Sequence, residues 1–163
     1  KYGDMVHERL ITGDDTSGKL VSEVKKKVSA VAKEKNKDWI LIDGSPGIGC
    51  PVIASLTGSD MAILVIEPTL SGFSDLKRVI EVVNHFKIPA GLVINKFDLN
   101  EKISDKIEAY CQEEEIELLT KIPYSRVIVK YLKKGELFVD NDSMLREKML
   151  SVKSKLNKKW EDG

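Results

Sequence analysis

Short apolar runs separated by helical patterns constrain the fold of this chain more than any other feature of its sequence. Runs rich in Ile, Val and Leu occupy residues 38–43, 61–68, 90–96 and 116–123. A run that is apolar at consecutive positions is typical of a strand buried on both faces, as in a parallel sheet. The sequence therefore predicts four strands of this kind.

Helical periodicity occurs before the first run, after the second and third runs, and again after the last one. The predicted helices cover residues 20–31, 76–83, 103–110, 125–135 and 143–160. We expect Ser74 or Asp75 to cap the second of these helices, and Gly135 to end the fourth. Alternating strands and helices form right-handed βαβ units. The pattern therefore predicts a doubly wound α/β fold, with a mainly parallel sheet between two helical layers.

Charge and composition exclude several classes of protein. The 26 Lys and Arg residues balance 26 Asp and Glu residues, whereas nucleic-acid binding normally needs a basic surplus. No apolar run approaches the ~20 residues that span a membrane. The spacing of Cys50 and Cys111 suggests neither a metal site nor a disulfide framework. We expect one cytoplasmic domain over residues 1–163.

The run at residues 38–43 ends in Asp43, and a glycine-rich loop follows it. An acid at the tip of a buried strand is a Walker B pattern, which holds Mg²⁺ beside the phosphates of a nucleotide. The loop, Gly44-Ser45-Pro46-Gly47-Ile48-Gly49, favours backbone N–H groups that face an anion. A tight strand-to-helix turn is the alternative, because glycine and an acid are common in such turns.

A second candidate motif follows the run at residues 90–96. Asn95-Lys96-Phe97-Asp98 fits the N-K-x-D pattern with which GTPases read guanine, whose N1 and N2 hydrogens the Asp accepts. Asn at the end of a strand also serves proteins that bind adenine. The motif therefore indicates a base pocket rather than guanine in particular, and a polar loop after a buried strand is the alternative.

Residues 13–20, GDDTSGKL, match the P-loop pattern G-x-x-x-x-G-K until Leu20, where that pattern requires Ser or Thr. Asp14 and Asp15 would place negative charge where a triphosphate sits, and Leu20 has no hydroxyl for Mg²⁺. We therefore favour a solvated loop at a helix entry over a P-loop. An accessory phosphate contact from Lys19 remains as an alternative.

With these motifs in place, the stretch from DWILIDGSPGIGCP to INKFDLN resembles the second half of a MinD/ParA/Mrp-type ATPase. This deviant-Walker-A group has a P-loop NTPase-like fold, and the likeness covers nearly all of the chain. The best match is the subgroup that carries an inserted ferredoxin domain with two iron–sulfur clusters. The resemblance implies that Asp43 is the Walker B Asp, that residues 44–49 form the phosphate-sensing switch II loop, and that Asn95 contacts adenine. Residues 122–125 would form the loop that lies against the base.

The site implied by this resemblance has a phosphate side and a base side. Asp43 and Gly47 would serve catalysis, and Asp43 would also hold Mg²⁺. The residues implied to contact ATP are Gly44, Ser45, Pro46, Gly49, Asn95, Lys96, Asp98, Pro123 and Tyr124.

Two features of the family have no counterpart in these 163 residues, namely the K-G-G-x-G-K-T/S P-loop and the Cys-rich ferredoxin motifs. We therefore expect the carboxyl-terminal part of a longer nucleotide-binding domain, inactive by itself. In the intact protein, ATP and Mg²⁺ would close a homodimer. Hydrolysis would then drive redox or iron–sulfur work with a partner protein, through the ferredoxin insert.

Two alternatives belong to other functional classes. The chain is either a non-catalytic interaction module that presents surfaces to a partner, or a GTPase-like switch that uses Asn95, Lys96 and Asp98. The resemblance also implies that a strand is missing from inside the sheet, which would leave the edges of two predicted strands unpaired. We expect a homodimer or a larger assembly through these edges, unless residues 1–12 fill the vacancy.

Overall fold

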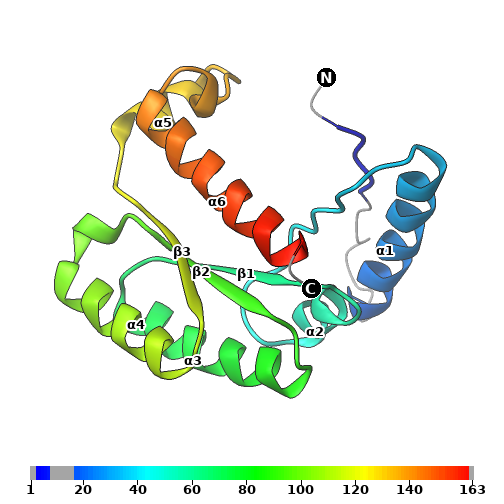
Figure 1. Cartoon of the computed structure of the whole chain (residues 1–163), viewed down its shortest axis with the longest axis horizontal. Coiled ribbons are helices and arrows are strands. Elements are labelled where there is room, and N and C mark those ends of the chain that lie inside the picture. Colours follow the sequence, from blue (N-terminus) through cyan, green and yellow to red (C-terminus); the bar gives the residue numbers. More distant parts are fainter. Residues whose placement is uncertain (1–2, 8–16, 162–163) are drawn as a thin grey trace. The chain divides into compact units, whose positions relative to one another are not determined.

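The structure is a computed structural model that describes residues 3–7 and 17–161 (Figure 1). Its strands are β1 (Ala62–Ile66), β2 (Ala90–Asn95) and β3 (Glu117–Ile122). Its helices are α1 (Ser17–Glu34), α2 (Cys50–Leu56), α3 (Leu70–His85), α4 (Glu101–Glu113), α5 (Arg126–Lys133) and α6 (Ser143–Glu161). Two 3-10 turns are η1 (Phe97–Leu99) and η2 (Phe138–Asp140).

The described residues form two compact units. The first unit draws on residues 3–7, 17–60 and 78–88, and the second on residues 61–77 and 89–161. The first unit therefore contains α1, α2 and the second half of α3. The second unit contains the sheet, the first half of α3, and α4 to α6.

The second unit is built on a parallel sheet in the order β1-β2-β3. β1 pairs with β2 from Ala62↔Ala90 to Ile66↔Ile94, and a helix lies between each strand and the next along the chain. Residues 91–94 of β2 are all buried, as expected for a strand covered on both faces. The predicted α/β class and parallel sheet are therefore confirmed.

Helices cover both faces of this sheet. Figure 1 shows α4 on one side of β3 and α6 on the other, and both helices contact β3. Ile107 of α4 and Leu145 of α6 are fully buried, which stabilises each helix by about 1.5–3 kcal/mol per side chain. The Lys155 ammonium of α6 donates to the carbonyl oxygens of Leu118 and Leu119, each at 2.9 Å. The second unit thus has the expected layered arrangement.

The first unit packs α1 against α2. The Lys25 ammonium of α1 donates to the carbonyl oxygens of Ser55 and Thr57, both at 2.7 Å. These carbonyls end α2 and have no further helical turn to accept from. Burial lowers the pKa of Lys25. Lys25 therefore joins the two helices through the carboxyl end of α2.

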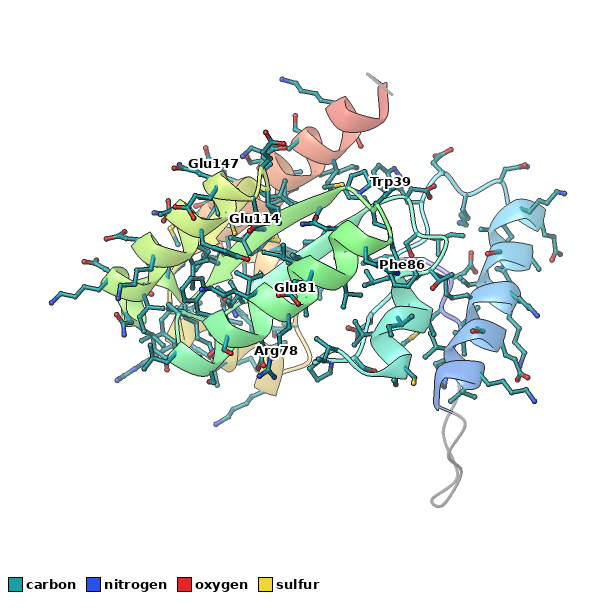
Figure 2. The ribbon with its side chains drawn as sticks, turned by 90° about the horizontal axis from the view of Figure 1, so that it is seen from below. Trp39, Arg78, Glu81, Phe86, Glu114 and Glu147 are labelled. Atoms are coloured by element: carbon teal, nitrogen blue, oxygen red, sulfur yellow. The ribbon has the colours of Figure 1, made fainter. Side chains whose placement is uncertain are left out.

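The predicted strand at residues 38–43 was wrong. This segment is not part of any sheet, and Trp39, labelled in Figure 2, is 51% exposed. Leu41 is 88% exposed. A strand forms only where a neighbouring backbone pairs with it, and the three strands of the second unit pair among themselves. Apolar composition is thus insufficient without a partner. Residues 3–7 are not a strand either, and the rest of residues 1–12 lie outside the described residues.

Burial of β1 on both faces was also wrong. Its side chains alternate between buried and exposed, with Ile63 37% and Val65 66% exposed. β1 is at the end of the described sheet, so only one edge of it is paired. The apolar run predicted the strand correctly, but it did not predict that one face of the strand is exposed.

The expected cap of α3 lies elsewhere. The helix begins at Leu70, and the Thr69 hydroxyl accepts a hydrogen bond from the Gly72 amide at 2.9 Å, so Ser74 and Asp75 lie inside the helix. A Cβ on residue 72 would lie 2.8 Å from the Glu67 carbonyl oxygen, so only glycine fits this close approach. By contrast, α5 does end before Gly135, which has a φ of +68°.

Candidate functional site

The base side of the predicted site lies at the carboxyl edge of the sheet in the second unit. Glu67 follows β1, Asn95 ends β2, and Pro123 and Tyr124 follow β3. Parallel strands bring their carboxyl ends to one edge, where ligands of open α/β sheets bind. The loops after all three strands therefore meet where the sequence placed a base pocket.

Lys96 is held in an unusual backbone conformation directly after β2. Its φ and ψ are 54° and 41°, in the left-handed region that costs a non-glycine residue about 1–2 kcal/mol. The Lys96 ammonium lies 2.5 Å from Glu67 Oε1, which ties this turn to the end of β1. Asn36, Lys87 and Glu115 also have a positive φ, so the tie to Glu67 distinguishes this turn more than its backbone conformation does. Glu67 was missed by the sequence analysis, although it is the only charged residue in the apolar run at residues 61–68.

Asp98 faces the neighbouring loop. Its Oδ1 accepts a hydrogen bond from the Tyr124 backbone amide at 2.6 Å. The structure thus brings together two predicted site residues that lie far apart in the sequence. Asp98 comes from η1, and Tyr124 comes from the loop between β3 and α5.

The turn that carries Asp98 is fixed by its other neighbours. The Ser104 hydroxyl donates to the Phe97 carbonyl at 2.8 Å, and the Asn100 side chain caps α4 by accepting from the Ile103 amide at 3.2 Å. The Lys121 ammonium lies over the Phe97 ring, 5.3 Å from its centroid. The sequence analysis missed these residues, of which only Asn100 gives a signal, as a capping residue before an acidic helical turn.

The phosphate side of the predicted site lies in the first unit. Asp43 and residues 44–49 form an exposed loop that leads into α2. Gly47 has a φ of +92°, which explains the glycine at that position. Gly49 precedes the first turn of α2, where Pro51 lies. Ser45 and Pro46 are exposed in the same loop, and Asp43 follows an extended segment rather than a strand.

A metal at this loop would depend on the nucleotide. In the described part of the chain, no group of three or more His, Cys, Asp or Glu side chains is arranged to hold a metal ion. Mg²⁺ is typically bound by one or two carboxylates together with water and substrate phosphates. Asp43 is an exposed carboxylate beside a glycine loop, so it fits a Mg²⁺ that arrives with the nucleotide. It does not fit a site that holds a metal ion without the nucleotide.

The described part of GDDTSGKL is helical. Gly18, Lys19 and Leu20 lie in the first turn of α1, whereas Asp14 and Asp15 lie outside the described residues. A Cβ on Gly18 would lie 3.4 Å from Cys50, so the start of α1 packs near the start of α2. Helical geometry at Gly18 agrees with the predicted helix entry.

No protein-family model matches the chain. The uncharacterized protein MJ0578 of Methanocaldococcus jannaschii is 28% identical over 152 residues, which are 93% of this chain and 50% of that protein. The uncharacterized protein MJ0579 of the same organism is 33% identical over 128 residues, 78% of this chain and 41% of that protein. The chain thus spans about half or less of the length of these curated relatives.

Solved structures identify the fold. The MinD cell division protein of Aquifex aeolicus matches with a TM-score of 0.66 and 17% identity, over 86% of this chain and 61% of that chain. MinD of Pyrococcus furiosus, a cell division ATPase, matches with a TM-score of 0.66 and 21% identity, over 86% of this chain and 58% of that chain. The MinC:MinD cell division protein complex of Aquifex aeolicus matches with a TM-score of 0.68 and 19% identity, over 84% of this chain and 59% of that chain. The chain has the MinD fold.

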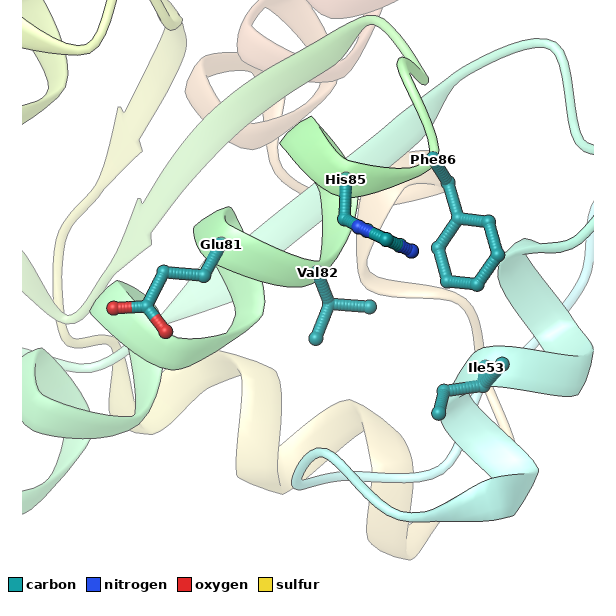
Figure 3. Close-up of a pocket in the computed structure, with 5 residues that line it drawn as sticks. All are labelled: Ile53, Glu81, Val82, His85 and Phe86. Atoms are coloured by element: carbon teal, nitrogen blue, oxygen red, sulfur yellow. The ribbon is translucent and has the colours of Figure 1, made fainter.

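Two cavities of the described structure are lined by none of the predicted site residues. A shallow one in the first unit, about 300 Å³, is lined by Ile53, Glu81, Val82, His85 and Phe86 (Figure 3). Another in the second unit, about 400 Å³, is lined by Thr120, Met144, Glu147, Lys148 and Ser151. No described helix is long and apolar enough to cross a membrane.

Proposed function

We propose that this chain is part of a MinD/ParA-type nucleotide-binding domain that takes an adenine nucleotide together with Mg²⁺. One observation carries the proposal. At the carboxyl edge of a MinD-like sheet, Lys96 is tied to Glu67 and Asp98 is tied to Tyr124, next to Asn95. A base pocket needs such fixed polar groups, because they give a flat apolar ring its orientation.

The base side acts through hydrogen bonding and stacking. The Asn95 side chain offers both an acceptor and donors, which match the amino group and the N1 acceptor of adenine. Pro123 and Tyr124 offer apolar surface for a face of the ring. Lys96 packs along the pocket while Glu67 holds its ammonium. Together these groups would select a purine and set its orientation.

The phosphate side acts through charge. When bound, Mg²⁺ neutralises the phosphate charge of the nucleotide. Asp43 would hold it directly or through water, and the backbone N–H groups of residues 44–49 would report the presence of the terminal phosphate. Gly47 serves this purpose through the backbone freedom that its positive φ records.

Titration calorimetry with ATP, ADP and GTP in the presence of Mg²⁺ tests the proposal. We expect adenine nucleotides to bind and Asn95→Ala to weaken them about tenfold or more, the effect of leaving a polar group unpaired. Asn84→Ala, which removes an exposed amide from α3, is the matched control. Absence of ATP and ADP binding, or equal binding by both variants, would contradict the proposal.

A GTPase-like switch is the second candidate, and the N-K-x-D order of Asn95, Lys96 and Asp98 at this edge favours it. Preferential binding of GTP that disappears in Asp98→Ala would establish it. Binding of neither purine nucleotide would favour the non-catalytic interaction module instead.

Coupling of ATP hydrolysis to redox or iron–sulfur work is the most specific part of the proposal, and it rests on the family resemblance. It concerns a longer protein with a P-loop and a ferredoxin insert. Iron and acid-labile sulfide in the natural gene product would support it, and absence of both would remove it.

The 163-residue chain should hydrolyse ATP no faster than background, because a P-loop Lys and its backbone cradle supply much of the catalysis. Mg²⁺-dependent turnover that disappears in Asp43→Ala would refute this expectation.

A further inference from the structure

The Asp98 carboxylate is engaged by the protein itself. The Tyr124 amide donates to its Oδ1 at 2.6 Å, a short bond of the kind that an ionised acceptor makes. In an N-K-x-D guanine site, by contrast, this carboxylate accepts from the base. The same residue type therefore has a different partner here.

The two ends of this hydrogen bond differ in how firmly they are held. Asp98 lies in η1, which follows the left-handed Lys96 and is tied to α4 through Ser104. Tyr124 lies between β3 and α5, in a loop without regular structure, and is 44% exposed. The bond to Asp98 joins the Tyr124 backbone to the turn after β2.

We propose that Asp98 is a positioning residue that holds the Tyr124 loop beside Asn95, so that the loop meets the adenine ring. This inference rests on the proposed nucleotide function and assigns Asp98 a role through Tyr124 rather than on the base. Adenine has no N1 hydrogen, so it needs no carboxylate at its edge, whereas guanine presents hydrogens at N1 and N2. A carboxylate whose Oδ1 accepts from a backbone amide therefore has a role that an adenine site can use and that needs no guanine hydrogens.

Substitution by asparagine separates the two roles. Asp98→Asn keeps an oxygen that accepts from the Tyr124 amide, but its amide group would oppose the N1 and N2 hydrogens of guanine. Asp98→Ala removes both functions. A positioning residue thus tolerates asparagine and not alanine, whereas a guanine-reading residue tolerates neither.

The experiment measures hydrogen exchange of the Tyr124 amide by NMR in the nucleotide-free 163-residue chain, followed by titration with ATP and GTP. We expect the Tyr124 amide to exchange slowly in the wild type and in Asp98→Asn, and about tenfold faster in Asp98→Ala. Tenfold corresponds to the lower end of the free energy that a hydrogen bond to a charged group contributes. ATP affinity should fall in Asp98→Ala and persist in Asp98→Asn. Unchanged exchange of the Ile94 amide in β2 would show that each variant is folded.

Matched controls isolate the backbone contact. Tyr124→Ala keeps the amide and removes the ring, so it should keep slow exchange while ATP binding weakens. Asp105→Ala removes an exposed acid of α4 and should change neither measurement.

Equal exchange at residue 124 in the wild type and Asp98→Ala would overturn the inference. So would GTP binding that both Asp98 variants abolish. The expected exchange pattern without binding of either nucleotide would confirm the positioning contact and refute the proposed function, so the two failures are distinguishable.

Discussion

Replacing Lys25 with methionine should destabilise the first unit by removing the contact between α1 and the end of α2. The Lys25 ammonium lies 2.7 Å from the Ser55 and Thr57 carbonyl oxygens, 3.4 Å from that of Ala54 and 3.2 Å from the Ser59 hydroxyl. Methionine keeps most of the apolar stem and loses the charge and all of its donors.

The expected size of the effect follows from three contributions. A hydrogen bond to a charged donor contributes about 1.5–3 kcal/mol, and a cation at a helix carboxyl end about 0.3–1 kcal/mol. Burial of the ammonium opposes both, as its lowered pKa records. The exposed Thr57 carbonyl would turn to water in the variant. Because the lowered pKa means that burial outweighs the favourable effects of the charge, the loss comes from the hydrogen-bond donors. We therefore expect a net loss of about 0.5–1.5 kcal/mol, or about 1–6 °C in the apparent Tm of a chain of this size.

The pH dependence has a definite sign. Because the pKa of Lys25 is lower in the folded than in the unfolded chain, the unfolded chain binds more protons in the window just below 10.5. The stability of the wild type relative to Lys25→Met should therefore rise with pH through that window. Thermal unfolding followed by circular dichroism measures both effects, with the exposed neighbour Lys26→Met as the control. Equal Tm values for the two variants, or a difference that shrinks as pH rises, would refute the reasoning.

Three further predictions concern other parts of the molecule. Gly72→Ala should lower the Tm by an amount equivalent to about 1–3 kcal/mol, because the new Cβ would lie 2.8 Å from the Glu67 carbonyl oxygen. Gly44→Ala is the control, because its Cβ would lie no closer than 3.7 Å to its neighbours, and equal Tm values for the two variants would contradict the prediction. Light scattering should show that the wild type self-associates and that Val65→Lys self-associates less, because Val65 is 66% exposed on β1, at the end of the described sheet. A monomeric wild type would rule out this prediction. At pH 8 a disulfide reagent should react rapidly with the exposed Cys50 and slowly with Cys111, whose pKa burial raises to about 11; rapid reaction of both thiols in the folded chain would be the opposite result.

The sequence predicts an element of this fold correctly where local residue composition alone determines the structure of that element. β2 is apolar up to its last residue, Asn95, and it is the central strand, so its composition and its environment agree. Residues 38–43 have a similar composition but no paired neighbour, and pairing is a property of the remaining chain that composition does not encode. The cap of α3 was misplaced because Thr69 and Gly72 act through a close approach to the end of β1, which a helical periodicity does not reveal.

The candidate site shows the same division. The motif at Asn95 and the loop at Tyr124 could be singled out from residue types and from their place after predicted strands. Their connection through Asp98 could not, because it joins a side chain to a backbone amide of another loop. The tie between Lys96 and Glu67 likewise depends on two strands being neighbours in the sheet.

The order of strands in the sheet has a consequence for how the chain is made. β1 pairs with β2 and β2 with β3, so each new strand joins the one that left the ribosome just before it. Each pairing needs only the intervening helix, α3 or α4, to close the connection, and such local closure costs less entropy than a distant one. The second unit can therefore assemble stepwise during synthesis, from β1 onward, without waiting for the carboxyl terminus. α6 contacts β3 and follows it in the chain, so it would be added to this core only after the three strands have paired.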